Sequence, residues 1–438
     1  MTWIQPEDLI GHELRQAREQ GKDVDAVEAR WLRAGGAPAP ARGASQEAAS
    51  QELRALAATL LDEVGRLPSP LAGDEPEDYD AIVAAGGRPA ALEPAPSLED
   101  RVSGAWLGRA VGCLLGKPVE SIPREGIRAI AESTGNWPLD SYFTEAGLDP
   151  AVGERWPWNR ASRPTSLLEN INGMPEDDDL NFTMLAILVL EYGGGSFTSL
   201  DVAKAWLDYL PPGRIFTAER IACRNLLLGL LPPETATYQN PFREWIGARL
   251  RVDAYGWAAP GDPVRAARMA WEDARLSHTA NGVYAAMFMA AAHAATLADV
   301  TASDAADIGL QVVPAQSRLA EAIGFARAQS GEWESIVDGL YERYGSLHWV
   351  HAINNTALVA AAMYHCASFE EAIGAVVSGG WDTDTNGAAV GSIFGALAGA
   401  GGIEPRWSGP LHDTVASSLP GFDASSIDGL ARRTLAAA

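Results

Sequence analysis

Hydrophobic residues recur along this chain at steps of three and four positions, the spacing of an amphipathic helix. A clear example near the N-terminus is the stripe formed by Leu53, Leu56, Leu60, Val64 and Leu67. From residue 98 onward one such segment follows another, whereas the alternation typical of a β-strand is nearly absent. The pattern predicts an all-α protein, with a compact multi-helix domain and an N-terminal helical extension.

The predicted helices form two groups, separated by a stretch that contains Pro89, Pro94 and Pro96. Proline interrupts helices because it lacks a backbone N–H group. We predict helices over 6–20, 24–32 and 53–67 before this stretch, and over 98–115, 181–192, 198–209, 218–231, 264–276, 282–297, 319–328, 333–344, 353–364, 369–377 and 388–399 after it. We therefore divide the chain into a helical extension, residues 1–98, and a main domain, residues 99–438. Long loops at 134–170 and 232–263 are typical of binding loops or lids.

Composition narrows the choice of partners. The 438 residues are 47% hydrophobic and 21% charged, as in an ordinary globular protein, and the formal net charge is −24. Such a charge argues against a nucleic-acid groove, because phosphate binding needs a basic surface. The longest apolar run, 282–297, is short for a membrane span. The three cysteines are far apart, and the N-terminus has no basic region followed by an apolar core. We therefore expect a cytoplasmic protein without nucleic-acid or membrane partners.

One short stretch places two carboxylates and two hydroxyls beside a predicted apolar helix. Asp382-Thr383-Asp384-Thr385 follows two glycines and precedes a predicted helix of small apolar residues. One interpretation is a helix cap, in which Asp or Thr accepts the free N–H groups of the first turn. The other is a cation site, because unpaired buried carboxylates are costly.

A second acidic run, Glu176-Asp177-Asp178-Asp179, also precedes an apolar helix. One or two acids would be enough for a cap, but four carboxylates beside a buried helix repel one another and favour a cation. The two runs together offer only oxygen ligands, which suit Mg²⁺, Mn²⁺ or Ca²⁺ better than Zn²⁺. Their number would suit two ions that share carboxylates and activate a water.

A third stretch ends in a single acid. Glycines at 104, 108, 112 and 116 leave one face of the 98–115 helix nearly bare, which allows another helix to pack closely. Glu120 follows Pro118 at the end of this segment and is free to point into a cleft. An isolated acid in this position is more often a surface residue.

These three stretches resemble the signatures of the ADP-ribosylglycohydrolase family, which includes ADP-ribosylarginine and ADP-ribosylserine hydrolases. The matching motifs are Gly-x-x-Leu-Gly-x-Pro-Val-Glu ending at Glu120, the acidic run 177–179, and Gly-Gly-Trp-Asp-Thr-Asp-Thr-Asn-Gly ending at Gly387. The resemblance covers about residues 100–405. It implies an all-α fold with two Mg²⁺ or Mn²⁺ ions at the bottom of an ADP-ribose cleft.

The resemblance also assigns residues. It implies metal ligands at Asp177, Asp178, Asp179, Asp382, Asp384 and Thr385, and catalytic carboxylates at Glu120, Asp384 and Asp178. We predict substrate contacts at Gly247, Arg251, His278, His351, Asn355 and Gly380. Of these, 247–251 resembles a loop near the ligand phosphates, and His278 has the alternative of a core histidine. The chain departs from the family in four places: Cys113 stands where many relatives have Asp, Asp177 replaces Thr, Trp381 is inserted beside the motif that ends at Gly387, and the extension of 98 residues is not part of the minimal domain.

The predicted function is metal-dependent cleavage of the bond between ribose C1 and a nitrogen or oxygen, in an ADP-ribosylated protein or a small riboside. Glu120 or Asp384 would act as general base. One alternative is an all-α diphosphate enzyme of the prenyl or terpene synthase type, whose Asp-rich motif resembles 177–179, although the second motif is absent. Another is a relative that binds ADP-ribose without catalysis. The leaving group and the oligomeric state stay open.

Overall fold

Helices build the described part of the chain, as the spacing of its apolar residues predicts. The structure is a computed structural model and describes residues 4–39, 45 and 47–438. The sequence-based expectation about a secretory signal concerns the N-terminus, of which residues 1–3 lie outside the described residues. In these ranges the β-structure consists of isolated β-bridges between loop residues and neighbouring segments. The predicted all-α class is therefore confirmed. No helix in the described ranges has the length and apolar character that a membrane crossing requires.

The α-helices run in this order: α1 (Pro6–Glu19), α2 (Asp25–Arg33), α3 (Gln51–Gly65), α4 (Tyr79–Ala85), α5 (Leu98–Gly116), α6 (Arg124–Ser133), α7 (Pro150–Arg155), α8 (Arg163–Ser166), α9 (Asp178–Gly193), α10 (Ser199–Tyr209), α11 (Thr217–Leu227), α12 (Glu234–Thr237), α13 (Asp253–Trp257), α14 (Pro263–Ala274), α15 (Ala280–Thr296), α16 (Ala302–Leu310), α17 (Arg318–Ala328), α18 (Trp333–Tyr344), α19 (Ala352–His365), α20 (Phe369–Ser378), α21 (Thr383–Ala398), α22 (Pro405–Ser408) and α23 (Ile427–Ala436). Short 3-10 helices are η1 (Lys117–Val119), η2 (Gly194–Ser196), η3 (Pro212–Arg214), η4 (Ile246–Arg251), η5 (Ala400–Gly402) and η6 (Gly409–Leu411).

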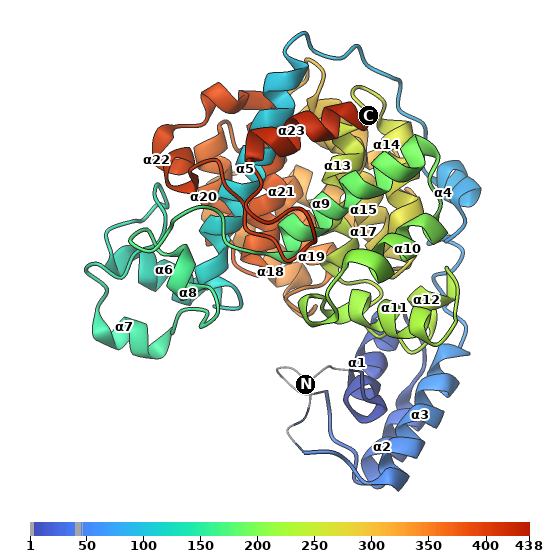
Figure 1. The fold of residues 1–438 in the computed structure, drawn as a ribbon. Coiled ribbons are helices and arrows are strands. Elements are labelled where there is room, and N and C mark those ends of the chain that lie inside the picture. Colours follow the sequence, from blue (N-terminus) through green and yellow to red (C-terminus); the bar gives the residue numbers. More distant parts are fainter. Residues whose placement is uncertain (1–3, 40–44, 46) are drawn as a thin grey trace.

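The first three helices pack on one end of the main domain, beside α11 (Figure 1). Their apolar core includes Leu60 and Val64 of the predicted stripe, and it continues into Ile221, Phe242 and Trp245. α4 differs, because its buried residues belong to the core of the main domain. The boundary of the extension at residue 98 stays a prediction.

Two helices at the centre of the main domain, α5 and α21, touch through their backbones (Figure 1). A Cβ atom on Gly112 would lie 1.9 Å from the carbonyl oxygen of Gly387, and one on Gly108 would lie 2.1 Å from that of Gly391. The glycine face predicted from the sequence therefore allows this contact. The helices are antiparallel, so the C-terminal end of α5 meets the N-terminal end of α21. There the Thr383 hydroxyl donates to the carbonyl of Gly116 at 2.8 Å.

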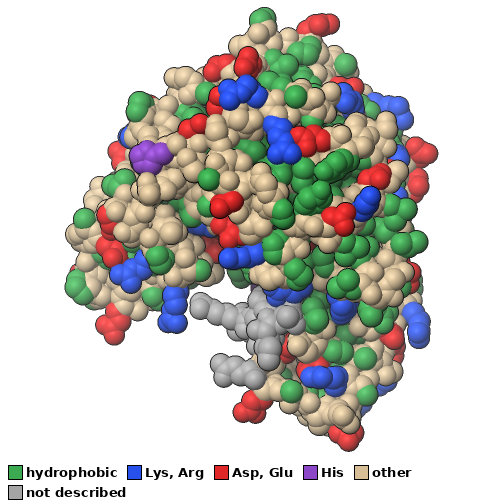
Figure 2. Space-filling model, in the orientation of Figure 1, with side chains coloured by type: hydrophobic (Ala, Val, Ile, Leu, Met, Phe, Trp, Pro, Cys, Tyr) green, Lys and Arg blue, Asp and Glu red, His purple; other side chains and the backbone are tan. Residues whose placement is uncertain are grey.

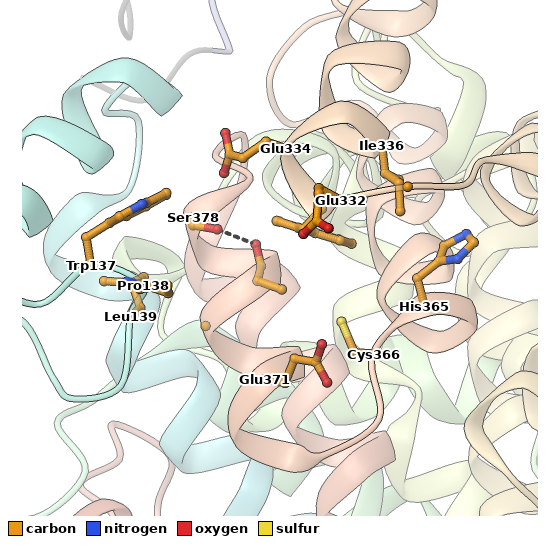
Figure 3. A pocket seen from close by; sticks show the side chains of 14 residues that line it. Trp137, Pro138, Leu139, Glu332, Glu334, Ile336, His365, Cys366, Glu371 and Ser378 are labelled. Carbon is orange, nitrogen blue, oxygen red and sulfur yellow. Dashed lines mark hydrogen bonds between the residues drawn. The ribbon is translucent and has the colours of Figure 1, made fainter.

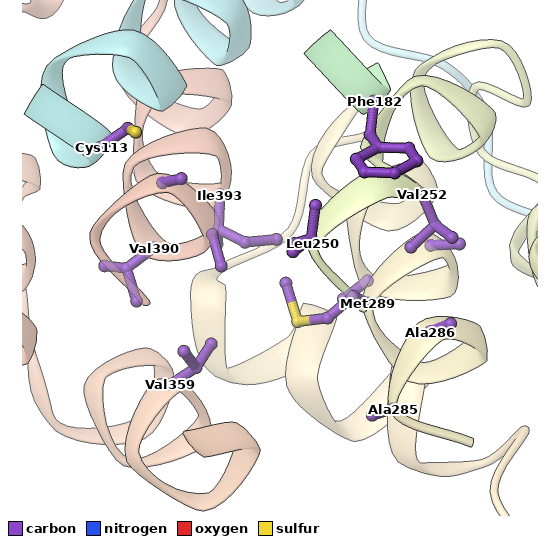
Figure 4. Packing of buried hydrophobic residues seen from close by; sticks show 14 of the residues in the cluster. Cys113, Phe182, Leu250, Val252, Ala285, Ala286, Met289, Val359, Val390 and Ile393 are labelled. Atoms are coloured by element: carbon purple, nitrogen blue, oxygen red, sulfur yellow. The ribbon is translucent and has the colours of Figure 1, made fainter. Parts of the chain in front are cut away.

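A layer of apolar side chains fills the space between this pair and the neighbouring helices. Figure 4 shows Cys113, Val390 and Ile393 on one side of this core, and Phe182, Val252 and Met289 on the other. α15 is buried along its whole length, which fits its nearly uniform apolar sequence. The core thus fixes α5, α9 and α21 relative to one another.

Candidate active site

The structure brings the three acidic motifs together at the ends of these central helices. Glu120 follows η1, Asp177 to Asp179 begin α9, and Asp382 to Thr385 begin α21. Carboxylate oxygens of Glu120, Asp382 and Asp384 lie within 4.8 Å of one another. A second group joins ligand atoms of Cys113, Asp177 and Asp179 within the same limit. The Thr385 hydroxyl links the motifs by donating to Asp179 Oδ2 at 3.1 Å.

The group formed by Glu120, Asp382 and Asp384 has no basic partner: within the described ranges none of the three forms an ion pair. Glu120 is half-buried, and its Oε2 accepts a hydrogen bond from Asn159 Nδ2 at 2.8 Å. Burial, followed by the charge of Asp384, raises the pKa of Glu120 well above its usual value. Burial and neighbouring carboxylates likewise raise the pKa values of Asp382 and Asp384. The group therefore attracts positive charge, either as protons or as a cation.

The group around Asp177 and Asp179 already contains cations. The ammonium of Lys117 contacts Asp177 Oδ2, and Asp177 Oδ1 accepts from the backbone N–H of Asp179 at 2.8 Å. Burial raises the pKa of Asp177, but Lys117 outweighs burial and leaves that pKa below its usual value. Arg109, fully buried on α5, lies 3.3 Å from Asp179 Oδ1. Asp178 is half-buried beside both groups, and burial and the charge of Asp177 raise its pKa.

The capping interpretation holds for Asp177 and, in the other motif, for Asp384, whose Oδ1 accepts the first-turn N–H of Thr385 at 3.0 Å, but it does not hold for Asp382. Asp177 is the N-cap of α9, and its side chain accepts the N–H of Asp179. Asp382 stands at the N-cap of α21 but makes no side-chain cap hydrogen bond. Asp382 is buried, and its carboxylate faces Glu120 and Asp384. The donor set of these three carboxylates fits a hard divalent cation such as Mg²⁺ or Mn²⁺.

Asn355, predicted to contact substrate, positions the loop that carries Asp382. Its Oδ1 accepts from the backbone N–H of Asp382 at 3.2 Å and from Asn386 Nδ2 at 2.7 Å. Asn386 in turn accepts from Arg249 at 2.6 Å. Burial lowers the pKa of Arg249 to about 10, against the charge of Asp382. These buried amides hold the start of α21 in place.

Three other predicted substrate residues lie in a separate buried network. Arg251 is 1% exposed, and all five of its N–H donors are used: they contact Glu219, Asp273, Ser277 and the carbonyls of Gly247 and Asp273. A Cβ atom on Gly247 would lie 2.0 Å from Glu219 Oε1. The assignment of Arg251 to ligand phosphates stays a prediction, and this arrangement leaves it no free donor.

His278 belongs to the same network. Its Nδ1 lies 2.8 Å from Ser277 Oγ, and burial, followed by the charge of Arg251, lowers its pKa well below the usual value. Its side chain is fully buried. These contacts favour the alternative of a neutral core histidine, and a substrate contact stays a prediction.

His351 and Gly380 also have structural roles. His351 is the N-cap of α19, where its Nδ1 accepts from the N–H of Ile353 at 3.2 Å, and burial lowers its pKa to about 4. Gly380 has a φ of +79°, and a Cβ atom there would lie 2.8 Å from the Tyr341 hydroxyl oxygen. Trp381, inserted beside the third motif, stacks on the ring of Tyr341 at 4.4 Å. The predicted contacts of His351 and Gly380 with substrate stay predictions.

Several residues that shape the site were not predicted. They are Arg109, Lys117, Asn159, Arg249 and Asn386. A signal existed for Lys117, because Asp in place of Thr at 177 adds a charge that needs a partner, and Lys117 is one of only three lysines in the chain. Arg249 and Asn386 lie inside two stretches that the sequence analysis singled out, 247–251 and the motif ending at Gly387, but their contact with each other arises only in the folded chain.

A cavity of about 450 Å³ lies beside α18 and α20, away from the acidic motifs. Figure 3 shows Trp137 on one side of it, and Glu332, Cys366 and Glu371 on the other. None of the six carboxylates of the site lines this cavity. The surface is also hollowed between the part that contains α6 to α8 and the N-terminal extension (Figure 2). Glu120 lies between η1 and α6, which begins at Arg124.

Comparisons with known proteins agree with the three motifs. A protein-family model described as ADP-ribosylglycohydrolase matches residues 94–438, most of the chain. A solved structure described as "ADP-ribosylglycohydrolase-related protein complex" has 21% sequence identity and a TM-score of 0.45, and the similarity covers 78% of this chain and 99% of the other. No curated protein matches the sequence significantly.

Proposed function

This chain belongs to the ADP-ribosylglycohydrolase family, whose members are metal-dependent hydrolases of ADP-ribose-linked compounds, and we propose that it cleaves the bond between ribose C1 and a nitrogen or oxygen of an ADP-ribosylated protein or small riboside. Because the chain belongs to this family, we do not retain the alternative of a prenyl or terpene synthase. The observation that carries the proposal is the close approach of Glu120, Asp382 and Asp384, within 4.8 Å and without a basic partner.

We assign these three carboxylates to a divalent cation, Mg²⁺ or Mn²⁺. Such an ion, when bound, would hold the ribose hydroxyls and lower the pKa of a water. The sequence predicted a pair of ions; of the two ligand groups found among the described residues, this is the one whose carboxylates form no ion pair with a protein cation. Asp178 and Thr385, beside both groups, are the remaining candidates for ligands.

Glu120 is the carboxylate that we assign as general base. It is half-buried at the end of η1, so it is open on one side, and the amide of Asn159 fixes its orientation. Burial, followed by the charge of Asp384, raises its pKa, which suits a group that takes a proton from water. The C1–N or C1–O bond would break through an oxocarbenium-like state. The water oxygen would then bond to C1, and one water proton would pass to Glu120. Glu120 would release this proton again to neutralise the departing nitrogen or oxygen, so that water supplies both the new hydroxyl of C1 and the proton of the leaving group.

The test is release of free ADP-ribose from ADP-ribosylated arginine, ADP-ribosylated serine and small N-ribosides, in the presence of Mg²⁺ or Mn²⁺. We expect Asp382→Asn and Asp384→Asn to lower turnover by more than about 100-fold, because loss of even an outer partner of a metal ligand costs 10–100-fold. Asp208→Asn, an exposed acid on α10, is the matched control and should keep full activity. Full turnover by both site variants would contradict the assignment. Metal binding without ADP-ribose release from any substrate would instead favour the non-catalytic relative.

A further inference from the structure

Every carboxylate oxygen of Asp177 and Asp179 already contacts a protein donor, and each carboxylate has a cationic side chain beside it. Asp177 uses Oδ2 for the ammonium of Lys117 and Oδ1 for the N–H of Asp179, at 2.8 Å. Asp179 uses Oδ1 for Arg109 Nη2 at 3.3 Å and Oδ2 for the Thr385 hydroxyl at 3.1 Å. The third ligand atom of this group is the thiol of Cys113, and hard cations such as Mg²⁺ prefer oxygen. This group therefore does not fit a second divalent ion.

The backbone holds Lys117 in this position. It begins η1 immediately after α5, whose last glycine packs against the carbonyl of Thr383 in α21. Its ammonium also donates to the carbonyl of Glu176 at 3.3 Å, and its side chain is only 9% exposed. Withdrawal of Lys117 would leave Asp177 buried without a counter-ion, which is costly. An added divalent ion would be repelled by the ammonium at short range.

The protein compensates a departure from the family motifs in this contact. Asp177 stands where the family has Thr and adds one negative charge, and Lys117 supplies one positive charge at the same point. We propose that the Lys117–Asp177 ion pair replaces one of the two metal ions expected from the resemblance. The chain then binds a single divalent cation, at Glu120, Asp382 and Asp384. This inference rests on the proposed metal-dependent hydrolysis and specifies its cofactor.

The test counts bound metal on the full chain, independently of activity. After removal of metal with EDTA, the protein is titrated with Mn²⁺ by calorimetry, and bound manganese is counted after dialysis by mass spectrometry. We expect one Mn²⁺ per wild-type chain. The double variant Lys117→Ala, Asp177→Thr should bind two, and its electron paramagnetic resonance spectrum should show coupling between ions about 3.5–4 Å apart. Lys204→Ala, which removes an exposed lysine of α10, is the control and should still bind one.

The outcomes separate this inference from the proposed function. Two ions on the wild-type chain would overturn the inference and leave metal-dependent hydrolysis standing, and this result does not depend on how the variants fold. One ion on a folded double variant would also overturn it. No bound ion on the wild-type chain would overturn the proposed metal dependence itself.

Discussion

Asn355 connects α19 to the loop that carries Asp382. Its Oδ1 accepts from Asp382 and Asn386, and its Nδ2 donates to the carbonyls of Trp349 and His351 at 2.8 Å each. Asn355→Ala leaves the backbone N–H of Asp382 without this acceptor, so the carboxylate loses its fixed position. We expect the affinity for Mn²⁺, measured by calorimetry, to fall by about 10–100-fold.

The matched control is Asn225→Ala on α11. Asn225 is equally buried and donates to the carbonyls of Thr235 and Tyr238, far along the chain from the acidic motifs. Both variants should lose thermal stability, because each leaves buried polar groups unpaired. Only Asn355→Ala should lose metal affinity. Equal metal affinities in the two variants would show that Asn355 has a structural role alone.

The raised pKa values in the carboxylate cluster predict how metal stabilisation depends on pH. Burial and mutual repulsion raise the pKa values of Glu120, Asp178, Asp179, Asp382 and Asp384. Between the unfolded values near 4 and these raised values, the unfolded chain binds fewer protons than the folded chain. The free energy of unfolding without metal therefore falls as pH rises through this window. A bound cation offsets this buried negative charge.

We therefore expect the increase in Tm caused by saturating Mg²⁺ to grow between about pH 5 and pH 8. Differential scanning fluorimetry with Mg²⁺ and with EDTA measures it at each pH. The Asp382→Asn variant, which removes one of the raised carboxyl groups, should show a smaller and flatter increase. An increase that shrinks toward pH 8 in the wild-type chain would have the wrong sign for this mechanism.

At the scale of single residues, the sequence predicts which carboxylates belong to the candidate site better than it predicts which side chains pair with the charged residues. The carboxylates at 120, 177–179, 382 and 384 could be predicted because their motifs lie in short stretches, and the structure brings them together. The ion pairs of Arg251 could not be predicted, because Glu219 and Asp273 approach it only in the folded chain. The same is true of Arg109, which reaches Asp253 across 144 positions. Periodicity specifies which face of a helix is buried, not which polar group meets it there.

The contact between α5 and α21 sets the distance between the acidic motifs. Gly112→Ala would place a Cβ atom 1.9 Å from the carbonyl oxygen of Gly387, so the two helices must separate. Overpacking of a filled core costs about 1–3 kcal/mol, and here the neighbour is backbone that cannot rotate away. We expect the free energy of unfolding, measured in urea, to fall by at least about 1–3 kcal/mol. The affinity for Mn²⁺ should fall with it, since the start of α21 moves.

Gly324→Ala is the matched control for this prediction. Gly324 lies inside α17, and a Cβ atom there would meet nothing within 4 Å. Alanine favours helix over glycine by about 0.8–1 kcal/mol, so this variant should be neutral or more stable. A Gly112→Ala variant as stable as Gly324→Ala would contradict the close contact.

Helix lengths explain which elements the sequence pattern could predict. α18 has the predicted bounds, and α1, α9 and α15 agree within a few residues, because each repeats its apolar spacing over several turns. The predicted loop at 232–263 instead contains η4 and α13, both fully buried. α13 has only five residues, too few for the spacing to repeat. Tertiary contacts, such as the ion pair between Asp253 and Arg109, hold such short helices.

At the scale of the whole molecule, the N-terminal extension meets the main domain through buried polar contacts as well as apolar ones. Glu244 is completely buried. It accepts from Gln16 of α1, from Gln20 at the C-cap of α1, from Asn281 of α15 and from Arg318 at the start of α17. His351 lies 3.6 Å from Glu19, and the carbonyl of His351 accepts from Asn355. The extension is thus connected through His351 to Asn355, the residue that positions Asp382.

This interface predicts an unusually large effect of one acid in the extension. Glu13 of α1 pairs with Arg243 of the main domain through two hydrogen bonds, at 2.7 and 3.0 Å, and both side chains are buried. Glu13→Ala leaves a guanidinium buried without its carboxylate. Breaking a buried pair in this way costs about 3–5 kcal/mol. We expect that loss in the free energy of unfolding, measured in urea.

Glu28→Ala provides the comparison, because Glu28 of α2 pairs with Arg18 on the surface of the same extension. A surface pair contributes about 0–1 kcal/mol, so this variant should unfold almost as the wild type does. If the extension and the main domain form one cooperative unit, Glu13→Ala will shift a single transition monitored by both fluorescence and circular dichroism. A separate early transition, with the main domain unchanged, would mean instead that the extension unfolds independently, which is the behaviour expected of a true domain boundary near residue 98.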